Sequence, residues 1–225
     1  IIEYFGPGAE TISCTGKASI CNMGAEVGAT CSIFPYDGKM AEYLCATGRA
    51  EIAGMASACA ACLEADPEVL ETPEAYYDKV IEIDLSALEP YVNGPFTPDA
   101  ACPISAMAAR VRSMGYPEDV RVSLIGSCTN SSYQDLSRAA SVARHYLDAG
   151  KQPKASLIVN PGSERIFRTA ERDGIIATLK EAGAVVMTNA CGPCIGQWKR
   201  RADNPTAANS IVTSFKRNFA KRADG

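Results

Sequence analysis

The chain is predicted to be an α/β protein with mainly parallel sheets. From Arg121 onward, short β-branched runs alternate with helical stretches, and strand–helix alternation favours parallel pairing through right-handed crossovers. In this part the expected strands are 122–125, 155–159, 184–188 and 210–214, and the expected helices are about 133–149 and 163–182. A length of 225 residues with 47% hydrophobic and 21% charged residues suits one large or two small globular domains.

Start and stop signals support the two long helices of this region. The first has apolar residues at helical spacing between Leu136 and Leu147, and Gly150 supplies its end signal. The second begins after Ser163, a preferred N-cap residue, and Gly174 is expected to interrupt it.

The first half of the chain is less regular. Helices are expected at 39–47 and 104–114, and the alternation of apolar and acidic residues from Val80 to Leu85 predicts a half-exposed strand. An Ala-rich, acidic stretch with a Pro/Glu segment fills 48–78. We therefore expect residues 1–78 to be the end of one α/β domain plus a connector, and 79–225 to be most of a second.

Charge and hydropathy argue against two classes of partner. The net charge is −4, and no stretch gathers enough Lys and Arg for a nucleic-acid footprint. No apolar run approaches the ~20 residues that span a bilayer. The chain begins at Ile1 and stops abruptly at Gly225, so we expect an internal piece of a longer protein.

Ten cysteines in a chain of this size favour reduced thiols over a disulfide framework, because no secretory signal is visible and the chain is long enough for a core. The expected location is an intracellular reducing compartment, either a mitochondrial matrix or a bacterial cytoplasm.

Three cysteines follow predicted strands. Cys128 comes after the strand at 122–125, and Cys191 and Cys194 come after the strand at 184–188, separated by a Gly-Pro turn. Ligand sites of open α/β sheets form at the carboxyl ends of strands. Soft thiolates suit zinc or iron–sulfur clusters, so these loops predict a metal site with three thiolate ligands.

Alternatives to an iron–sulfur site remain at this point. A closed zinc site needs a fourth ligand, and the one histidine, His145, lies within a predicted helix in a poor position. All three cysteines can also be small buried apolar residues. Cys59 and Cys62, a second CxxC pair in an Ala-rich segment expected to be helical, are interpreted either as structural, packing as small apolar residues, or as incidental.

Other polar residues admit a structural and a functional interpretation. Asn22 and Glu26 share one helical face, and a solvated helix start explains them on the sequence alone. Arg217 and Arg222 follow the last predicted strand and suit bidentate binding of carboxylates. Residues 160–163 are either a helix cap or an anion site.

The motifs together resemble a known family. Residues 126–132 (GSCTNSS), 189–198 (NACGPCIGQW) and 211–214 (IVTS) are similar to the aconitase and isopropylmalate dehydratase family. Residues 20–26, 93–98 and 160–163 extend the match over nearly the whole chain. The resemblance implies two three-layer α/β/α sub-domains with mainly parallel sheets, and a [4Fe-4S] hydro-lyase that interconverts citrate and isocitrate through cis-aconitate.

Carried over by position, the resemblance implies roles for seven residues. Cys128, Cys191 and Cys194 match the cluster ligands, which leave one iron without a protein ligand. Arg217 and Arg222 match arginines that bind substrate carboxylates. Glu26 matches a carboxylate near the labile iron, and Asn22 matches an amide beside the cluster.

One position departs from the family pattern. Lys216 stands where the mitochondrial aconitases have Asn, next to the cluster sulfurs. Either a cation there alters the cluster's charge and potential, or the side chain turns away from the cluster.

The implied partners are a small tricarboxylate and further domains of the same enzyme, which supply His and Asp residues, a Ser base and more Arg; this fragment alone is expected to be inactive. The alternatives are a homoaconitase, an isopropylmalate dehydratase large subunit, or a non-enzymatic metal-binding module.

Overall fold

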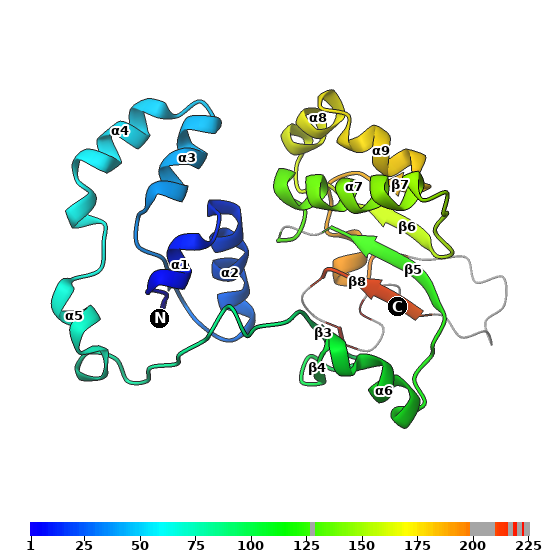
Figure 1. Cartoon of the computed structure of the whole chain (residues 1–225), viewed down its shortest axis with the longest axis horizontal. Helices are drawn as coiled ribbons and strands as arrows, with labels where there is room; N and C mark the ends of the chain where they lie inside the picture. Colours follow the sequence, from blue (N-terminus) through cyan, green and yellow to red (C-terminus); the bar gives the residue numbers. More distant parts are fainter. Residues whose placement is uncertain (127–128, 199–209, 216–217, 220–221, 223–225) are drawn as a thin grey trace. The chain divides into compact units, whose positions relative to one another are not determined.

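A computed structural model describes residues 1–126, 129–198, 210–215, 218–219 and 222. The chain divides into two compact units, residues 1–88 and 89–225 (Figure 1). Within the described residues, no helix is of a length and apolarity that would let it cross a membrane. The division of the chain into domains at residue 78 stays a prediction.

The first unit is mainly helical and has one short pair of parallel strands. Strand β1 pairs with β2 through Ile2 and Ser32 and through Glu3 and Ile33. Its elements are β1 (Ile2–Glu3), α1 (Pro7–Thr11), α2 (Cys14–Glu26), β2 (Ser32–Ile33), α3 (Gly38–Ala46), α4 (Ala50–Ala58), η1 (Ala60–Cys62), α5 (Pro67–Glu71) and η2 (Pro73–Ala75).

The second unit contains a small hairpin and a larger sheet. Its elements are β3 (Tyr91–Asn93), β4 (Ala101–Pro103), α6 (Ile104–Met114), β5 (Val120–Ile125), α7 (Tyr133–Asp148), β6 (Ser156–Val159), α8 (Glu164–Arg172), α9 (Ile175–Glu181), β7 (Ala184–Val186), η3 (Gly192–Ile195) and β8 (Ser210–Thr213). Strands β3 and β4 are antiparallel.

The larger sheet has the strand order β7-β6-β5-β8, and all three pairings are parallel. The chain adds β6 and β7 on one side of β5 and then returns to place β8 on the other side. The strand order therefore reverses between β5 and β8, and ligands of open α/β sheets bind at such a reversal. The predicted class, a mixed α/β fold with mainly parallel sheets, is confirmed.

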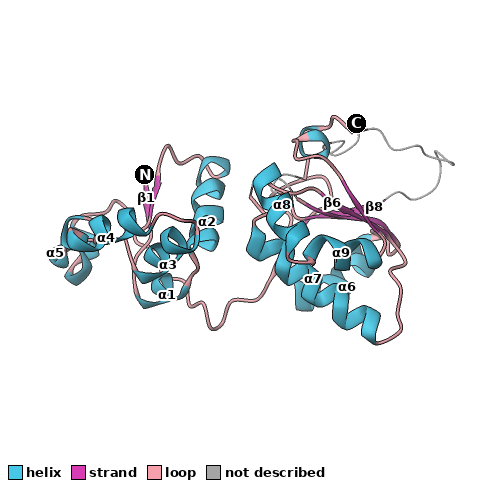
Figure 2. Ribbon diagram, turned by 90° about the horizontal axis from the view of Figure 1, so that it is seen from above, coloured by secondary structure: helices cyan, strands magenta, loops and turns pink. Residues whose placement is uncertain are grey.

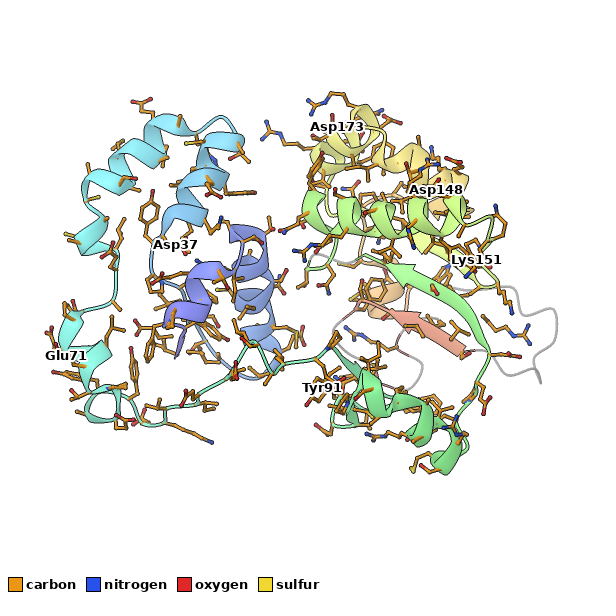
Figure 3. The ribbon with its side chains drawn as sticks, in the orientation of Figure 1. Asp37, Glu71, Tyr91, Asp148, Lys151 and Asp173 are labelled. Atoms are coloured by element: carbon orange, nitrogen blue, oxygen red, sulfur yellow. The ribbon has the colours of Figure 1, made fainter. Side chains whose placement is uncertain are left out.

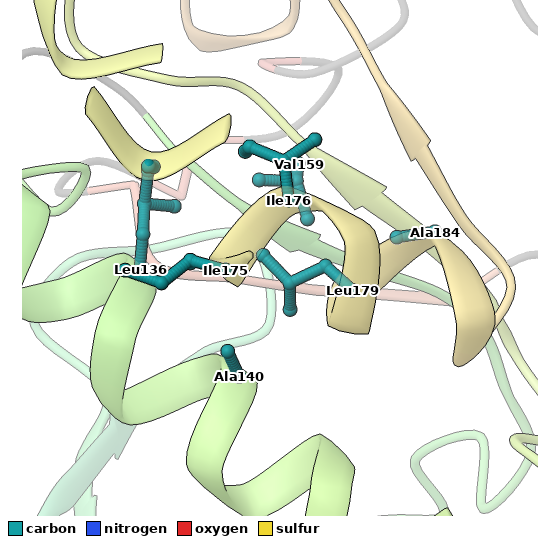
Figure 4. Packing of buried hydrophobic residues seen from close by; sticks show 8 residues of the cluster. Leu136, Ala140, Val159, Ile175, Ile176, Leu179 and Ala184 are labelled. Carbon is teal, nitrogen blue, oxygen red and sulfur yellow. The ribbon is translucent and has the colours of Figure 1, made fainter. Parts of the chain in front are cut away.

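Helices α7, α8 and α9 lie together on one side of this sheet, as Figures 1 and 2 show. Leu136 from α7, Ile176 and Leu179 from α9 and Val159 from β6 are almost fully buried in the core between them (Figure 4). Burial of each such side chain stabilises the fold by about 1.5–3 kcal/mol. This core holds the strands whose loops carry the cysteines.

The predicted helix boundaries of this unit are confirmed. Helix α7 begins with a capping box in which Ser132 and Asp135 bond each other's backbone amides. The Ser163 hydroxyl caps α8 by accepting from the Ile166 amide at 3.1 Å. Gly174, at a φ of 78°, separates α8 from α9 as the interruption predicted.

The strand predicted between Val80 and Leu85 is wrong. Residues 79–85 run as coil and the start of a turn, and no described strand pairs with them. Ile81 and Ile83 are 69% and 62% exposed, so the alternation does not mark a buried face.

The interior of the first unit is organised around a buried ion pair. Lys17 of α2 is 3% exposed and pairs with Asp37, which also caps α3 by accepting from the Met40 amide at 3.0 Å. The Lys17 ammonium lies 5.7 Å from the centre of the Phe34 ring, and that ring stacks on Tyr4. Asp37 thus joins α2 to α3 (Figure 3).

Gly24 allows α2 to approach Ser32 closely. A methyl group at Gly24 would overlap Ser32 Oγ and lie 3.2 Å from Ser32 Cβ. We expect Gly24→Ala to destabilise the protein by about 1–3 kcal/mol through overpacking. Gly54→Ala in α4 is the matched control because nothing lies within 4 Å of its added methyl, and it is expected to stabilise by up to about 1 kcal/mol.

Urea unfolding followed by far-ultraviolet ellipticity measures both effects. Adding Ser32→Ala to Gly24→Ala is expected to restore part of the loss. Equal midpoints for the two single variants would contradict the close approach.

The protonated hydroxyl of Tyr77 is expected to make the stability of the protein fall at alkaline pH. Its hydroxyl donates to Glu3 Oε2 at 2.6 Å, and partial burial together with this hydrogen bond raises the pKa of Tyr77 to about 12, from 10. The folded state therefore holds the Tyr77 proton more tightly than the unfolded state does. The resulting contribution of Tyr77 to the free energy of unfolding is complete below pH 10 and is lost as pH rises through 12.

We expect Tyr77→Phe to flatten the fall in unfolding free energy between pH 10 and 12. Urea titrations at stepped alkaline pH measure the slope. The exposed neighbour Tyr76 is the control, because Tyr76→Phe is expected to keep the wild-type slope. An unchanged slope in Tyr77→Phe would show that the Glu3 contact carries no alkaline linkage.

Candidate metal centre

The loops that carry the predicted ligands leave the carboxyl ends of parallel strands of one sheet. The first cysteine loop follows β5, and the second follows β7. The segment with the predicted arginines follows β8, the neighbour of β5. Parallel pairing therefore sends all three segments off the same edge of the sheet.

Ser214 anchors the start of the first cysteine loop. Its hydroxyl accepts from the Gly126 amide at 3.0 Å and donates to the Gly126 carbonyl at 3.2 Å. The Asn130 side-chain amide donates to the Ser214 carbonyl. The residues on both sides of Cys128 are thereby bonded to the end of β8.

The second cysteine loop turns sharply after β7. The Met187 amide donates to the Val159 carbonyl at 2.8 Å, and the chain then enters the 3₁₀ turn η3. The Cys194 amide donates to the Cys191 carbonyl at 2.6 Å, and Gly196 at a φ of 76° ends the turn. Because positions i and i+3 eclipse in a 3₁₀ turn, Cys191 and Cys194 share one face.

Asn160 joins the two loops. It is 3% exposed, and its side-chain amide donates to the Ala190 carbonyl at 2.6 Å, next to Cys191. The same residue touches the first loop, since a methyl group at Gly126 would lie 2.6 Å from Asn160 Cβ. The buried Asn160 Oδ1 has no hydrogen-bond partner among the described residues.

No sequence pattern assigned this linking role to Asn160. Residues 160–163 suggested a cap or an anion site, and the cap is present at Ser163. The useful signal is an asparagine directly after a strand and before a proline, because its amide then stands at the loop edge of the sheet.

The structure brings two of the three predicted cluster ligands together. Cys191 is exposed and Cys194 is partly buried, and both belong to one turn. Cys128 lies outside the described residues. Among the described residues, no three His, Cys, Asp or Glu side chains form a group that would hold a metal ion. A turn that presents one exposed and one partly buried cysteine after a strand fits a thiolate-bound metal.

Of the predicted substrate arginines, Arg217 lies outside the described residues, as does Lys216. Arg222 is partly buried, and its amide donates to the Phe219 carbonyl at 3.0 Å. The buried Arg222 Nε has no acceptor among the described residues. A buried guanidinium donor without an acceptor is suited to an anionic ligand.

Asn218 is a second polar residue of this segment whose side chain has buried atoms. Both polar atoms of its amide are buried without a partner among the described residues. A methyl group at Gly94, which precedes a cis Pro95, would lie 2.7 Å from Asn218 Nδ2. The loop at 93–98, one of the motifs of the resemblance, thus lies against the segment after β8.

Asn22 and Glu26 lie in α2 of the first unit, where both make interactions with neighbouring groups. Asn22 is exposed and Glu26, the last residue of the helix, is partly buried. Their spacing of four places them on one helix face. Their roles toward the cluster remain predictions.

Comparison with known proteins gives a family match over the whole chain. The model of the aconitase family (aconitate hydratase) matches residues 1–225. The mitochondrial aconitate hydratases of Schizosaccharomyces pombe and Emericella nidulans are 53% and 54% identical to the chain over 224 residues. The mitochondrial homocitrate dehydratase of Saccharomyces cerevisiae is 53% identical over 227 residues.

Each of these alignments covers 100% of the chain and 28% of the relative. The chain thus spans little more than a quarter of the length of the curated relatives it matches. Since the family match includes every residue of the chain, the chain belongs to the aconitase family.

Proposed function

We propose that the protein containing this chain is an iron–sulfur hydro-lyase that isomerises citrate and isocitrate through cis-aconitate. Family membership and the names of the aconitate hydratases support the hydro-lyase class. The observation that carries the cluster is the Cys191–Cys194 turn at the sheet edge, which Asn160 ties to the start of the first cysteine loop.

Cys128, Cys191 and Cys194 are proposed as the ligands of a [4Fe-4S] cluster. The anchoring of Gly126 and Asn130 to Ser214 supports this assignment, because it fixes both flanks of Cys128. When bound, the cluster supplies a Lewis-acidic iron without a protein ligand, which assists removal of the substrate hydroxyl.

The chain's own residues would bind and orient the substrate. Arg222 and Arg217 are proposed to hold substrate carboxylates, since a guanidinium donates two parallel hydrogen bonds to such a group. The unpartnered Arg222 Nε supports a carboxylate acceptor at that point. Glu26 and Asn22 are proposed to hold the leaving hydroxyl and its protons by hydrogen bonds.

The remainder of the protein is proposed to complete the site. The base that removes the carbon-bound proton is expected outside the chain. Large apolar side chains of the first unit, including Val27, Ile52 and Met55 at 68%, 50% and 63% exposure, support a covering partner. Names of the relatives support a mitochondrial location, with a bacterial cytoplasm as the alternative.

A homocitrate substrate is the second candidate. A homocitrate dehydratase matches the chain at an identity close to that of the aconitate hydratases. Both reactions keep the cluster and the carboxylate-binding arginines and differ in one substituent of the substrate. Lys216 adds a cation close in sequence to those arginines and is proposed to influence this choice.

Anaerobic reconstitution of the full-length protein tests the proposal. We expect about four iron and four sulfide per chain, as a [4Fe-4S] cluster requires, and a citrate-dependent change at one iron by Mössbauer spectroscopy. Cys191→Ser is expected to lose sulfide and dehydration of citrate. Cys45→Ser, which changes an exposed cysteine of α3, is the control and is expected to retain both.

Assays of the same preparation distinguish the two candidate substrates and identify the bound metal. Dehydration of citrate faster than of homocitrate supports the first candidate, and the reverse order supports the second. Bound zinc without sulfide would overturn the cluster and favour a non-enzymatic metal-binding module.

A further inference from the structure

The second CxxC pair forms a turn of its own. Cys59 lies directly after α4 and before η1, and the Cys62 amide donates to the Cys59 carbonyl at 2.9 Å. The Leu63 amide donates to the Ala60 carbonyl at 2.7 Å and continues the 3₁₀ pattern. The segment is helical as expected, but α4 ends before the pair and the pair itself spans a 3₁₀ turn.

Of the two interpretations of these cysteines, packing as small apolar residues is wrong. Cys59 and Cys62 are both exposed free thiols, so neither fills the interior of the first unit. The Cys59 thiol donates only a weak hydrogen bond, to the Met55 carbonyl at 3.2 Å. Rotation of that side chain therefore costs little.

The backbone of the turn has the spacing that a disulfide needs. A 3₁₀ turn rises about 2.0 Å per residue and eclipses positions i and i+3, which places their Cα atoms about 6 Å apart on one face. Disulfides join Cα atoms about 4.4–6.8 Å apart, so the Cα spacing of the turn is in range, and the two Cβ atoms must close to about 3.5–4.5 Å when the bond forms. The turn at Cys191 has the same i+3 hydrogen bond, so the chain uses this geometry for paired thiols twice.

Contacts on both sides hold the turn in place. The Tyr36 hydroxyl bonds to the Ala53 carbonyl at 3.3 Å and to Ser57 Oγ at 3.1 Å, on the last turns of α4. The Tyr36 amide donates to the Leu63 carbonyl at 2.9 Å, directly after Cys62. The two thiols are therefore presented by a fixed backbone.

We propose that Cys59 and Cys62 form a redox-active dithiol that low-molecular-weight disulfides, the class of oxidised glutathione, convert to an intramolecular disulfide. One thiolate attacks a sulfur of the small disulfide, forms a mixed disulfide and releases one small thiolate. The second protein thiol then attacks the mixed disulfide, forms the Cys59–Cys62 bond and releases the other. Two small thiols carry away the two protons and the two electrons lost by the protein.

Tryptic digestion separates this pair from every other cysteine. Cleavage after Arg49 and Lys79 yields peptide 50–79, whose only cysteines are Cys59 and Cys62. Cleavage after Lys39 and Arg49 yields peptide 40–49, which carries the exposed Cys45 alone. Cys45 is thus the built-in control for an exposed thiol without a nearby partner.

The full-length protein is equilibrated in glutathione buffers of increasing oxidised fraction, blocked with N-ethylmaleimide and analysed by mass spectrometry. We expect peptide 50–79 to become lighter by two hydrogens and to lose both labels with one midpoint. Peptide 40–49 is expected to carry only the label or one glutathione. In Cys59→Ser, Cys62 is expected to stop at the glutathione adduct.

Three results would overturn the proposal. They are two labels on peptide 50–79 at every buffer ratio, two glutathiones on that peptide, or a cross-link from it to another cysteine. The readout does not depend on the cluster or on turnover, so it stands apart from the test of the proposed function.

Discussion

Lys17→Met is expected to lower the unfolding free energy of the first unit by about 3–5 kcal/mol, the usual cost of removing one partner of a buried ion pair. The Lys17 side chain is 4% exposed and that of Asp37 is 17% exposed. The methionine keeps the apolar stem but leaves the Asp37 carboxylate without its cation. The remaining cap bond from the Met40 amide stabilises Asp37 only in part.

Native-state hydrogen exchange measures this loss locally, because the two units need not unfold together. Peptides from α2 and α3 are expected to lose protection, whereas peptides from α7 keep theirs. Lys39→Met is the matched control: its partner Glu42 is 69% exposed, and the expected loss is at most about 1 kcal/mol. Similar losses in the two variants would show that the Lys17–Asp37 pair does not hold α2 to α3.

The second unit was largely predictable because its signals are local and periodic. The apolar spacing of α7 and the serine before α8 are signals that lie within a few residues of the helix ends they predict. The CxxC at 191–194 likewise forms its turn through bonds between near neighbours.

The contacts that assemble the site were not predictable in this way. Ser214 bonds to Gly126 across 88 positions, and Asn160 bonds to Ala190 across 30. The first depends on the parallel register of β5 with β8 and the second on that of β6 with β7, and the local pattern specifies neither register. The burial of Lys17 was not predictable for a related reason. It is favourable only because Asp37, the residue that caps α3, pairs with it.

The Cys59–Cys62 turn is a place where helix propensity alone did not predict the backbone conformation. Its Ala-rich surroundings favour helix, but α4 ends at Ala58 and the chain tightens into η1. Tertiary hydrogen bonds from Tyr36 to residues on both sides of the turn accompany this change. Sequence spacing identified the pair, and only the fold revealed that both thiols face solvent.

Gly126→Ala is expected to disrupt the candidate metal centre more than any other single methyl group added in the second unit. The new Cβ would lie 2.6 Å from Asn160 Cβ and 2.9 Å from the Asn160 carbonyl oxygen. Backbone atoms cannot rotate away, so β5 and β6 must separate at the edge where the cysteine loops leave the sheet. The expected loss is about 1–3 kcal/mol from overpacking, and the separation also displaces Asn160, whose side-chain amide bonds to the Ala190 carbonyl.

Gly115→Ala is the matched control in the same unit. It has a φ of 64° but nothing within 4 Å of the added methyl, so it carries only backbone strain of roughly 1–2 kcal/mol. Trp198, the one tryptophan of the chain, stands four residues after Cys194, and its fluorescence in urea is expected to follow the second unit. Sulfide content after reconstitution is expected to fall in Gly126→Ala and to stay at the wild-type level in Gly115→Ala. The two variants are expected to lose similar amounts of stability, but only Gly126→Ala displaces the cysteine loops. If both variants kept their sulfide, the contact between Gly126 and Asn160 would therefore have no part in holding the cluster.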